Sequence, residues 1–237
     1  MMNRRQTCQM NQGWKAFIIS LLGAGSLLIP ALAPAQVTTT KEGFLFRKKF
    51  SEGDAWVYHV ETKVTMGEGR RAPKGGSNSL STLTVKGLQG KSAILELSDA
   101  PVKKNERPTT AFTLKVDELG RIEGSPVGGG VVGFALPEKP VKVGDKFNIR
   151  LESGAGNKDI IQHTVKFVGF TTLSKQKVAR WDVITAGKGS SVLTGTGAVY
   201  LNITDGSLYQ SQMNLTAIVQ RNGQPVRVVM ATTITLK

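Results

Sequence analysis

Apolar and polar residues alternate along most of the chain after residue 43, with a repeat of two residues. In one run Phe147, Ile149 and Leu151 are separated by polar residues, and similar runs recur to the C-terminus. A period of two places alternate side chains on opposite faces of a β-strand, whereas a helix repeats every 3.6 residues. The pattern therefore predicts an all-β protein, with alternating runs at 56–64, 82–86, 93–97, 112–117, 147–151, 161–167, 179–183, 199–203, 213–219 and 226–236.

The chain reads as two similar halves. A Gly-Asp pair followed by an alternating strand occurs at 53–54 and again at 144–145. Glycine tolerates positive φ and aspartate bonds the nearby backbone, so both pairs predict turns. We expect one β domain over residues 36–237, with halves at about 43–135 and 136–237. The glycine-rich stretch 128–133 is expected to be a linker or, less simply, a flap between them.

About eleven or twelve antiparallel strands are expected in total. Asn222-Gly223, between two alternating runs, predicts a tight hairpin. Polar loops are expected at 67–79 and 99–108. Many strands with one apolar face must close on themselves or cover that face, so a barrel, a half-barrel and a pair of packed sheets are all compatible with the pattern.

The first 35 residues have the features of a secretory signal peptide. Arg4, Arg5 and Lys15 precede an apolar run, and small residues at Ala33 and Ala35 suit cleavage before Gln36. The alternative is an uncleaved membrane anchor, but the apolar run is short for a membrane span. We therefore expect an exported protein, periplasmic or extracellular, with no transmembrane span after cleavage. The single cysteine, Cys8, lies ahead of the apolar run, so the mature chain would lack disulfides.

The chain is strongly basic. Lysine and arginine number 31 against 17 acidic residues, which gives a formal net charge of +14. Such a charge favours anionic partners, for an exported protein a lipid headgroup or an acidic envelope polymer, although solubility alone is a simpler explanation. The basic runs are short and are not interleaved with aromatic residues, so no nucleic-acid partner is expected.

Three segments resemble an uncharacterised family of bacterial exported proteins and lipoproteins. They read LPEKPVKVGDKF at 136–147, FRKKFSEGDAW at 46–56 and TLTVKGL at 82–88. This chain departs from that family by lacking a lipobox cysteine and by having Phe147 where tryptophan is more usual. The family has no established activity, so the resemblance implies no catalytic or binding residue.

Catalytic and metal-binding patterns are weak. His59 shares a predicted polar face with Glu61, a pair that could serve a hydrolase together with Asp54, although no nucleophile is placed near it. His163 lies on an apolar face, where a hydrogen-bonded core histidine is the simplest interpretation and a ligand pocket the next. Two histidines on different strands do not make a metal site, and no cofactor is expected.

The sequence favours a non-enzymatic β-protein that binds an apolar or amphipathic anionic ligand, such as a lipid, in the hollow of a curved sheet. A structural or interaction module of the cell envelope, without a ligand cavity, is the alternative, and a hydrolase is the third. The expected ligand-binding residues are Trp56, Tyr58, Phe112, His163, Phe167 and Trp181.

The export hypothesis predicts the N-terminus of the mature protein. Mass spectrometry of protein purified from its own host should show a chain that begins at Gln36, because signal peptidase cuts after small residues. A chain that begins at Met1 would instead support the membrane-anchor alternative.

Overall fold

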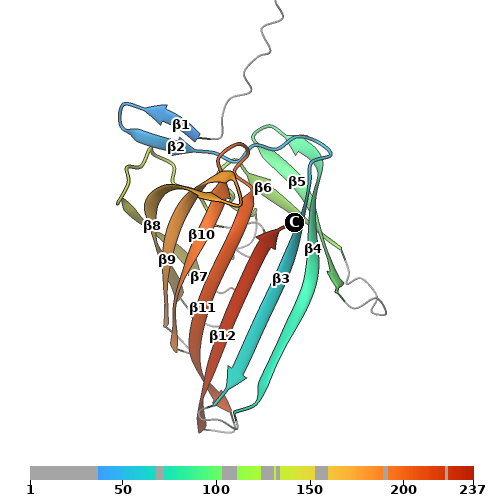
Figure 1. Cartoon of the computed structure of the whole chain (residues 1–237), viewed down its shortest axis with the longest axis vertical. Helices are drawn as coiled ribbons and strands as arrows, with labels where there is room; N and C mark the ends of the chain where they lie inside the picture. The colour runs from blue at the N-terminus through green and yellow to red at the C-terminus, as the bar shows by residue number, and fades with distance from the viewer. Residues whose placement is uncertain are drawn as a thin grey trace, which may run out of the picture. The chain divides into compact units, whose positions relative to one another are not determined.

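The chain folds into β-strands. The computed structural model describes residues 37–67, 72–102, 111–123, 131, 134–152, 160–188, 192–221 and 224–237, and the regular elements in these residues are strands (Figure 1). The predicted all-β class is therefore confirmed. The strands are β1 (Val37–Thr40), β2 (Gly43–Phe46), β3 (Ala55–Met66), β4 (Lys74–Gln89), β5 (Ser92–Pro101), β6 (Phe112–Asp117), β7 (Lys146–Glu152), β8 (Ile160–Leu173), β9 (Gln176–Lys188), β10 (Val192–Asn202), β11 (Leu208–Arg221) and β12 (Gln224–Leu236).

Ten of the strands form one antiparallel sheet in the order β6-β5-β4-β3-β12-β11-β10-β9-β8-β7, and β1 pairs with β2 in a small second sheet. Neighbouring strands of the large sheet are consecutive in sequence, except where β12 pairs with β3. That pairing joins β3–β6, which come earlier in the sequence, to β7–β12. The sheet ends at β6 and β7, which are not paired with each other in the described residues, so the barrel alternative was wrong.

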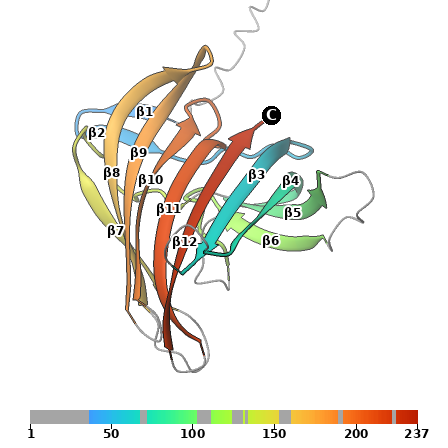
Figure 2. The same cartoon turned by 60° about the horizontal axis from the view of Figure 1, so that its bottom comes forward.

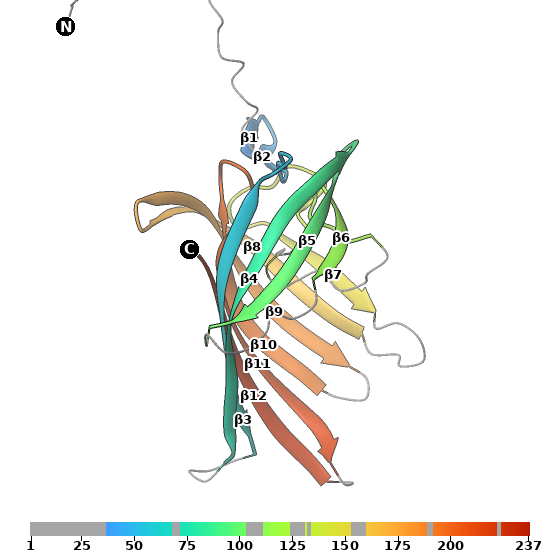
Figure 3. The same cartoon turned by 90° about the vertical axis from the view of Figure 1, so that its right-hand side faces the viewer.

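The large sheet has two distinct faces. Directly paired residues lie on the same face, so the register places Trp181, Val199 and Ser211 side by side across β9, β10 and β11. We call the face that carries Tyr58 and Trp181 the inner face. A single core cluster includes inner-face residues of β3–β5 and of β8–β10, so the sheet must bend with this face inward (Figures 2 and 3).

The β1–β2 pair contributes the aromatic residues that fill one end of this bend. Phe46 of β2 is fully buried, with its ring centroid 4.8 Å from Trp181 and 5.1 Å from Phe167. Phe44 lies 5.0 Å from Phe170, edge to face. These distances and tilts are those of favourable aromatic pairs. The aromatic part of the core therefore lies where β2 packs against β8 and β9.

Both predicted Gly-Asp turns are present and have the same local geometry. The Asp54 carboxylate accepts a hydrogen bond from the Ser51 N–H (2.8 Å), and the Asp145 carboxylate accepts one from the Lys142 N–H (2.7 Å). The glycine before each aspartate has a positive φ, 85° and 97°. Each aspartate thus closes the turn that starts its strand.

The two turns also attach to the sheet in the same way. The turn glycine donates its N–H to the Val85 carbonyl in one case (3.0 Å) and to the Phe167 carbonyl in the other (2.8 Å). The amides of these residues donate back to the Asp54 and Asp145 carbonyls (2.8 and 3.0 Å). A shift in strand register follows at once in both strands. The repeated sequence pattern therefore corresponds to a repeated turn structure.

Some sequence predictions need correction. β4 begins at Lys74, so residues 74–79 of the stretch expected as a polar loop at 67–79 are strand, and β5 extends into the loop expected at 99–108 as far as Pro101. β1 was not predicted, because its sequence VTTT has a single apolar residue. Asn222-Gly223, residues 1–35 and most of 128–133 lie outside the described residues, although β11 and β12 do pair up to Arg221 and Gln224.

Two inner-face glycines let β11 side chains lie over β10. A Cβ atom on Gly195 would collide with the Leu215 side chain, and one on Gly197 would collide with Met213. Glycine inside a strand often marks such a close approach at a bend. Because Gly195 and Gly197 have no side chains, Leu215 and Met213 can pack over β10 on the inner face.

Replacing Gly197 by valine should destabilise the protein by about 1–3 kcal/mol, because the new side chain must displace Met213. Urea unfolding would measure the loss. The control is Thr196→Val, which adds no volume to the inner face since Thr196 is exposed on the other side of the same strand. Equal unfolding midpoints for the two variants would contradict the proposed close packing.

Candidate functional site

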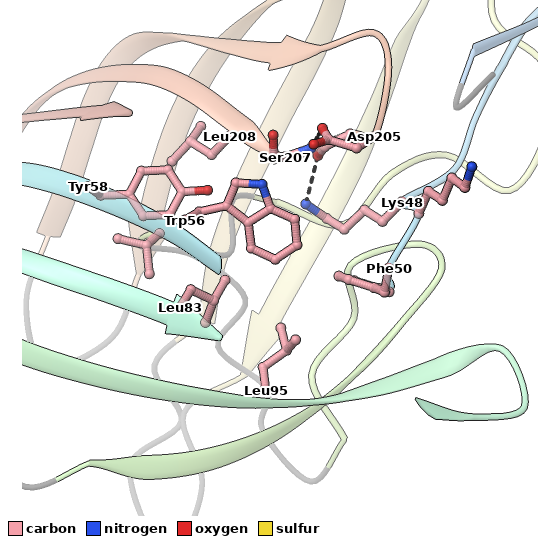
Figure 4. A pocket seen from close by; sticks show the side chains of 12 residues that line it. Lys48, Phe50, Trp56, Tyr58, Leu83, Leu95, Asp205, Ser207 and Leu208 are labelled. Carbon is pink, nitrogen blue, oxygen red and sulfur yellow. Dashed lines mark hydrogen bonds between the residues drawn. The ribbon is translucent and has the colours of Figure 1, made fainter. Parts of the chain in front are cut away.

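Residues from four strands and three connecting segments surround a small pocket at the core (Figure 4). Its volume is about 20 Å³, which is room for about one water molecule. Two of the residues predicted to bind a ligand, Trp56 and Tyr58, line it. This pocket is therefore too small for a lipid. Its other lining residues are Lys48, Lys49, Phe50, Leu83, Leu95, Val131, Asp205, Gly206, Ser207 and Leu208.

Lys48 brings a positive charge into this pocket. Its side chain is buried, and its Nζ donates a hydrogen bond to the Gly206 carbonyl (3.2 Å), drawn as a dashed line in Figure 4. The Lys48 stem passes so close to Gly120 that a Cβ atom there would collide with it. Next to it, the Lys49 N–H donates to the Asp205 carbonyl (2.8 Å). The chain after β2 is thus held on the turn between β10 and β11.

Burial changes the acid–base behaviour of two pocket residues. Desolvation lowers the pKa of Lys48 to about 8, and the nearby Asp205 carboxylate only partly offsets this. Burial raises the pKa of Tyr58, and the negative charge of Asp205 raises it further. The Ser207 hydroxyl is also buried and has no hydrogen-bond partner among the described residues. A water molecule would fit the pocket in both size and polarity.

The other predicted site residues lie elsewhere. Phe167 and Trp181 are fully buried in the aromatic cluster under β2, with ring centroids 4.7 Å apart. Phe112 is 49% exposed at the start of β6, an edge strand. His163 is partly buried, and its Nδ1 lies 2.8 Å from the Thr185 hydroxyl. The structure thus brings Trp56 and Tyr58 together, and Phe167 and Trp181 together, but it does not gather all six residues into one site.

The inner face continues beyond the core as a partly exposed apolar surface, which we call the apolar panel. It lies at the far ends of β3, β10, β11 and β12, and the register places Val64 opposite Met230 and Met230 opposite Leu215. Within the described residues, no panel residue belongs to the core cluster or packs against it. The panel consists of Val64, Met66, Leu193, Leu215, Ala217, Val219, Val226, Val228 and Met230.

His163 lies in line with this panel. Successive pairings run from His163 to Thr185, on to Gly195 and then to Leu215. A polar pair therefore borders the apolar side chains on the same face. Burial lowers the pKa of His163, so its imidazole is neutral at neutral pH and can either donate or accept a hydrogen bond. Sequence alternation indicated which face His163 occupies, but it could not show which strands lie beside it.

The residues considered for a hydrolase are engaged with other partners. His59 Nε2 contacts the Asn78 side chain on the outer face, and Glu61 forms a 3.0 Å ion pair with Lys63. Asp54 caps its own turn. Among the described residues, no group of three or more histidine, cysteine, aspartate or glutamate side chains is arranged to hold a metal ion. The described part of the chain also contains no helix long and apolar enough to cross a membrane.

Comparisons with known proteins assign no family to the chain. No model of a known protein family matches the chain, and a search of curated protein sequences found no match.

The buried Lys48 should make stability depend on alkaline pH. Between about pH 8 and pH 10.5 the unfolded chain holds a proton on this lysine that the folded protein has lost, so stability should rise with pH, by at most about 3 kcal/mol. Above about pH 10 the raised pKa of Tyr58 acts in the opposite direction, because the unfolded tyrosine ionises first.

Urea unfolding at pH 7.5 and pH 10 would measure this rise. Lys48→Met should remove it, because methionine keeps most of the stem without a charge, whereas Lys41→Met, at an exposed lysine, should leave it unchanged. A rise that persists in Lys48→Met would show that other groups cause it.

Proposed function

We propose that this protein binds an amphipathic anionic molecule of the lipid class on the inner face of its sheet, with the apolar part of the ligand on the apolar panel. The observation that carries the proposal is the panel itself. Most of its side chains are half-buried, Met66 is 43% exposed, and none is part of the described core. In soluble proteins, contiguous exposed apolar side chains outside the core are typical of binding surfaces.

The panel offers enough apolar surface for useful affinity. Full burial of a Val, Leu or Met side chain is worth about 1.5–3 kcal/mol. Covering the remaining exposed part of several such side chains would offset much of the entropy lost when a flexible chain is bound. The sheet bends toward this face, so a long apolar chain could contact β3, β12, β11 and β10 at once.

The polar end of the ligand is assigned to the β8–β9 side. His163 borders the panel there, and the buried Thr185 orients its ring through the hydrogen bond with Nδ1 (2.8 Å). This assignment keeps His163 as a ligand-binding residue. It gives Phe167 and Trp181 a supporting role, since their rings are fully buried under β2.

The basic character of the chain supports an anionic ligand, since its formal net charge is +14. Export to a cell envelope or beyond, with residues 1–35 removed, remains a prediction from sequence, as does the resemblance to exported bacterial proteins. Both are consistent with a carrier or sensor of envelope lipids. We further propose that the two halves share one origin, because their Gly-Asp turns have the same hydrogen bonds.

A structural module of the envelope is the second candidate. The small volume of the Lys48 pocket favours it, because no lipid fits where Trp56 and Tyr58 meet. In that case the panel would be covered by a protein partner instead of a lipid. The two functions differ in whether the isolated protein binds an amphipathic small molecule.

Titration with a dansyl-labelled undecanoic acid would test the proposal. Wild-type protein should enhance and blue-shift the dansyl emission with saturable binding. Met230→Lys and Leu215→Lys should each weaken binding at least about tenfold, because a charge in the panel must be desolvated when the chain binds.

The matched control is Val229→Lys. Val229 neighbours Met230 on β12 but points to the outer face, so binding should change less than about twofold. Circular dichroism would confirm that all three variants are folded. Wild-type protein that fails to bind the probe, or a Val229→Lys variant as impaired as Met230→Lys, would refute ligand binding on the panel and favour the structural module.

A further inference from the structure

We propose that the far ends of β10, β11 and β12 dock on the surface of an anionic lipid bilayer. We call this surface the strand tip and define it by Val192, Ile218 and Arg227 on the outer face, with Met66 on the inner face. The strand tip shares Met66, at the end of β3, with the apolar panel, but its other residues lie on the opposite face of the sheet. The proposal stands whether or not the panel carries a ligand.

The strand tip is apolar on the face that is otherwise polar. Val192 and Ile218 are 54% and 44% exposed, and the register pairs them directly across β10 and β11. Other exposed apolar residues of the outer face are isolated: Ile184 lies between Thr164 and Thr196. Single exposed apolar residues are normal, but a contiguous pair at the end of a sheet marks a contact surface.

The inner face is also apolar at these strand ends. Met66 is 43% exposed and pairs with Val228, which pairs with Ala217. The Gly67 N–H donates to the Arg227 carbonyl (2.7 Å), which fixes the end of β3 beside that of β12. Strand ends that are apolar on both faces can enter the interfacial layer of a bilayer without exposing a polar face to acyl chains.

Basic side chains lie beside this apolar end, on β12, β3 and β4. Arg227 is the direct cross-strand neighbour of Ile218, and Lys63 and Lys74 follow on the outer face of β3 and β4. On the described part of β3, the acidic Glu61 lies on the same face and pairs with Lys63 (3.0 Å). An apolar tip with basic neighbours is complementary to anionic headgroups above acyl chains, and the net charge of +14 would draw the protein to such a surface.

The arrangement of the sheet makes the tip accessible. β11, β12, β3 and β4 extend away from the β1–β2 end, and their far ends lie together (Figures 1 and 3). The core is concentrated at the β1–β2 end, where Phe46 meets Trp181. A membrane could therefore contact the tip without disturbing the core.

Vesicle flotation would test this proposal. The probes are vesicles of phosphatidylcholine with and without phosphatidylglycerol, at low and high salt, with every protein checked by mass spectrometry for the same N-terminus. Wild-type protein should float with the anionic vesicles at low salt at least about tenfold more than with the neutral ones, and salt should weaken the binding. Equal binding to both vesicle types would overturn the proposal.

Matched variants separate the tip from the rest of the surface. Ile218→Asp should reduce partitioning onto anionic vesicles at least about tenfold. Val57→Asp, which makes the same charge change at an exposed outer-face valine near the start of β3, should reduce it less than about twofold. Equal losses in the two variants, or no loss in Ile218→Asp, would overturn the assignment.

Two further measurements keep this proposal distinct from the others. The Met230→Lys variant should still bind the vesicles. Loss of ligand binding on the panel would therefore not by itself remove vesicle binding. Sedimentation velocity should show wild-type protein and Ile218→Asp with the same mass in solution. A wild-type dimer that Ile218→Asp dissociates would show that the tip binds a second copy of the chain and would overturn membrane docking.

Discussion

The pairing of β12 with β3 is the constraint on which the rest of the structure depends. It joins the last strand of the chain to the first long one and so unites two runs of sequential hairpins in a single ten-stranded sheet. Its register also sets Met230 beside Val64 and Ile234 beside Val60, which makes the inner faces of the two runs continuous. Without this pairing there would be two smaller sheets, each with its own edges.

A continuous inner face creates more apolar surface than the described core covers. The core takes the end where β2 lies over β8 and β9, and its aromatic rings pack at centroid distances near 5 Å. The opposite end of the same face keeps its apolar side chains outside the core cluster. The proposed ligand surface follows from this uneven filling, because it uses the strand ends that the core does not reach. The proposed membrane surface lies at the same strand ends, mainly on the outer face.

Local sequence patterns predicted which residues of a strand share a face of the sheet. Alternation with a period of two placed His163 with apolar residues, and the register pairs it with Ile149. It placed His59 on the polar outer face, where the register pairs it with Leu80 and Thr235. Each Gly-Asp pair predicted a turn, because the required φ and the aspartate hydrogen bond are both local. The strand start at Lys74 was missed, because Gly75 and Gly76 have no side chains to show alternation.

Non-local features could not be predicted in the same way. Arg47, Lys48 and Lys49 look like an exposed basic run, yet Lys48 is buried because the turn before β11 lies across it. Nothing in the local sequence around Met230 indicates that Val64 would be its neighbour. The six predicted ligand-binding residues share an aromatic ring and an expected face, and neither property depends on which strands are neighbours.

The most direct measurement is photo-crosslinking with a diazirine-labelled fatty acid, followed by peptide mapping. The account predicts that label is incorporated into peptides that contain the far ends of β3, β11 and β12, around Val64, Leu215 and Met230, and that unlabelled fatty acid competes for it. Label confined to other peptides, or incorporation that does not respond to competition, would contradict ligand binding on the inner face.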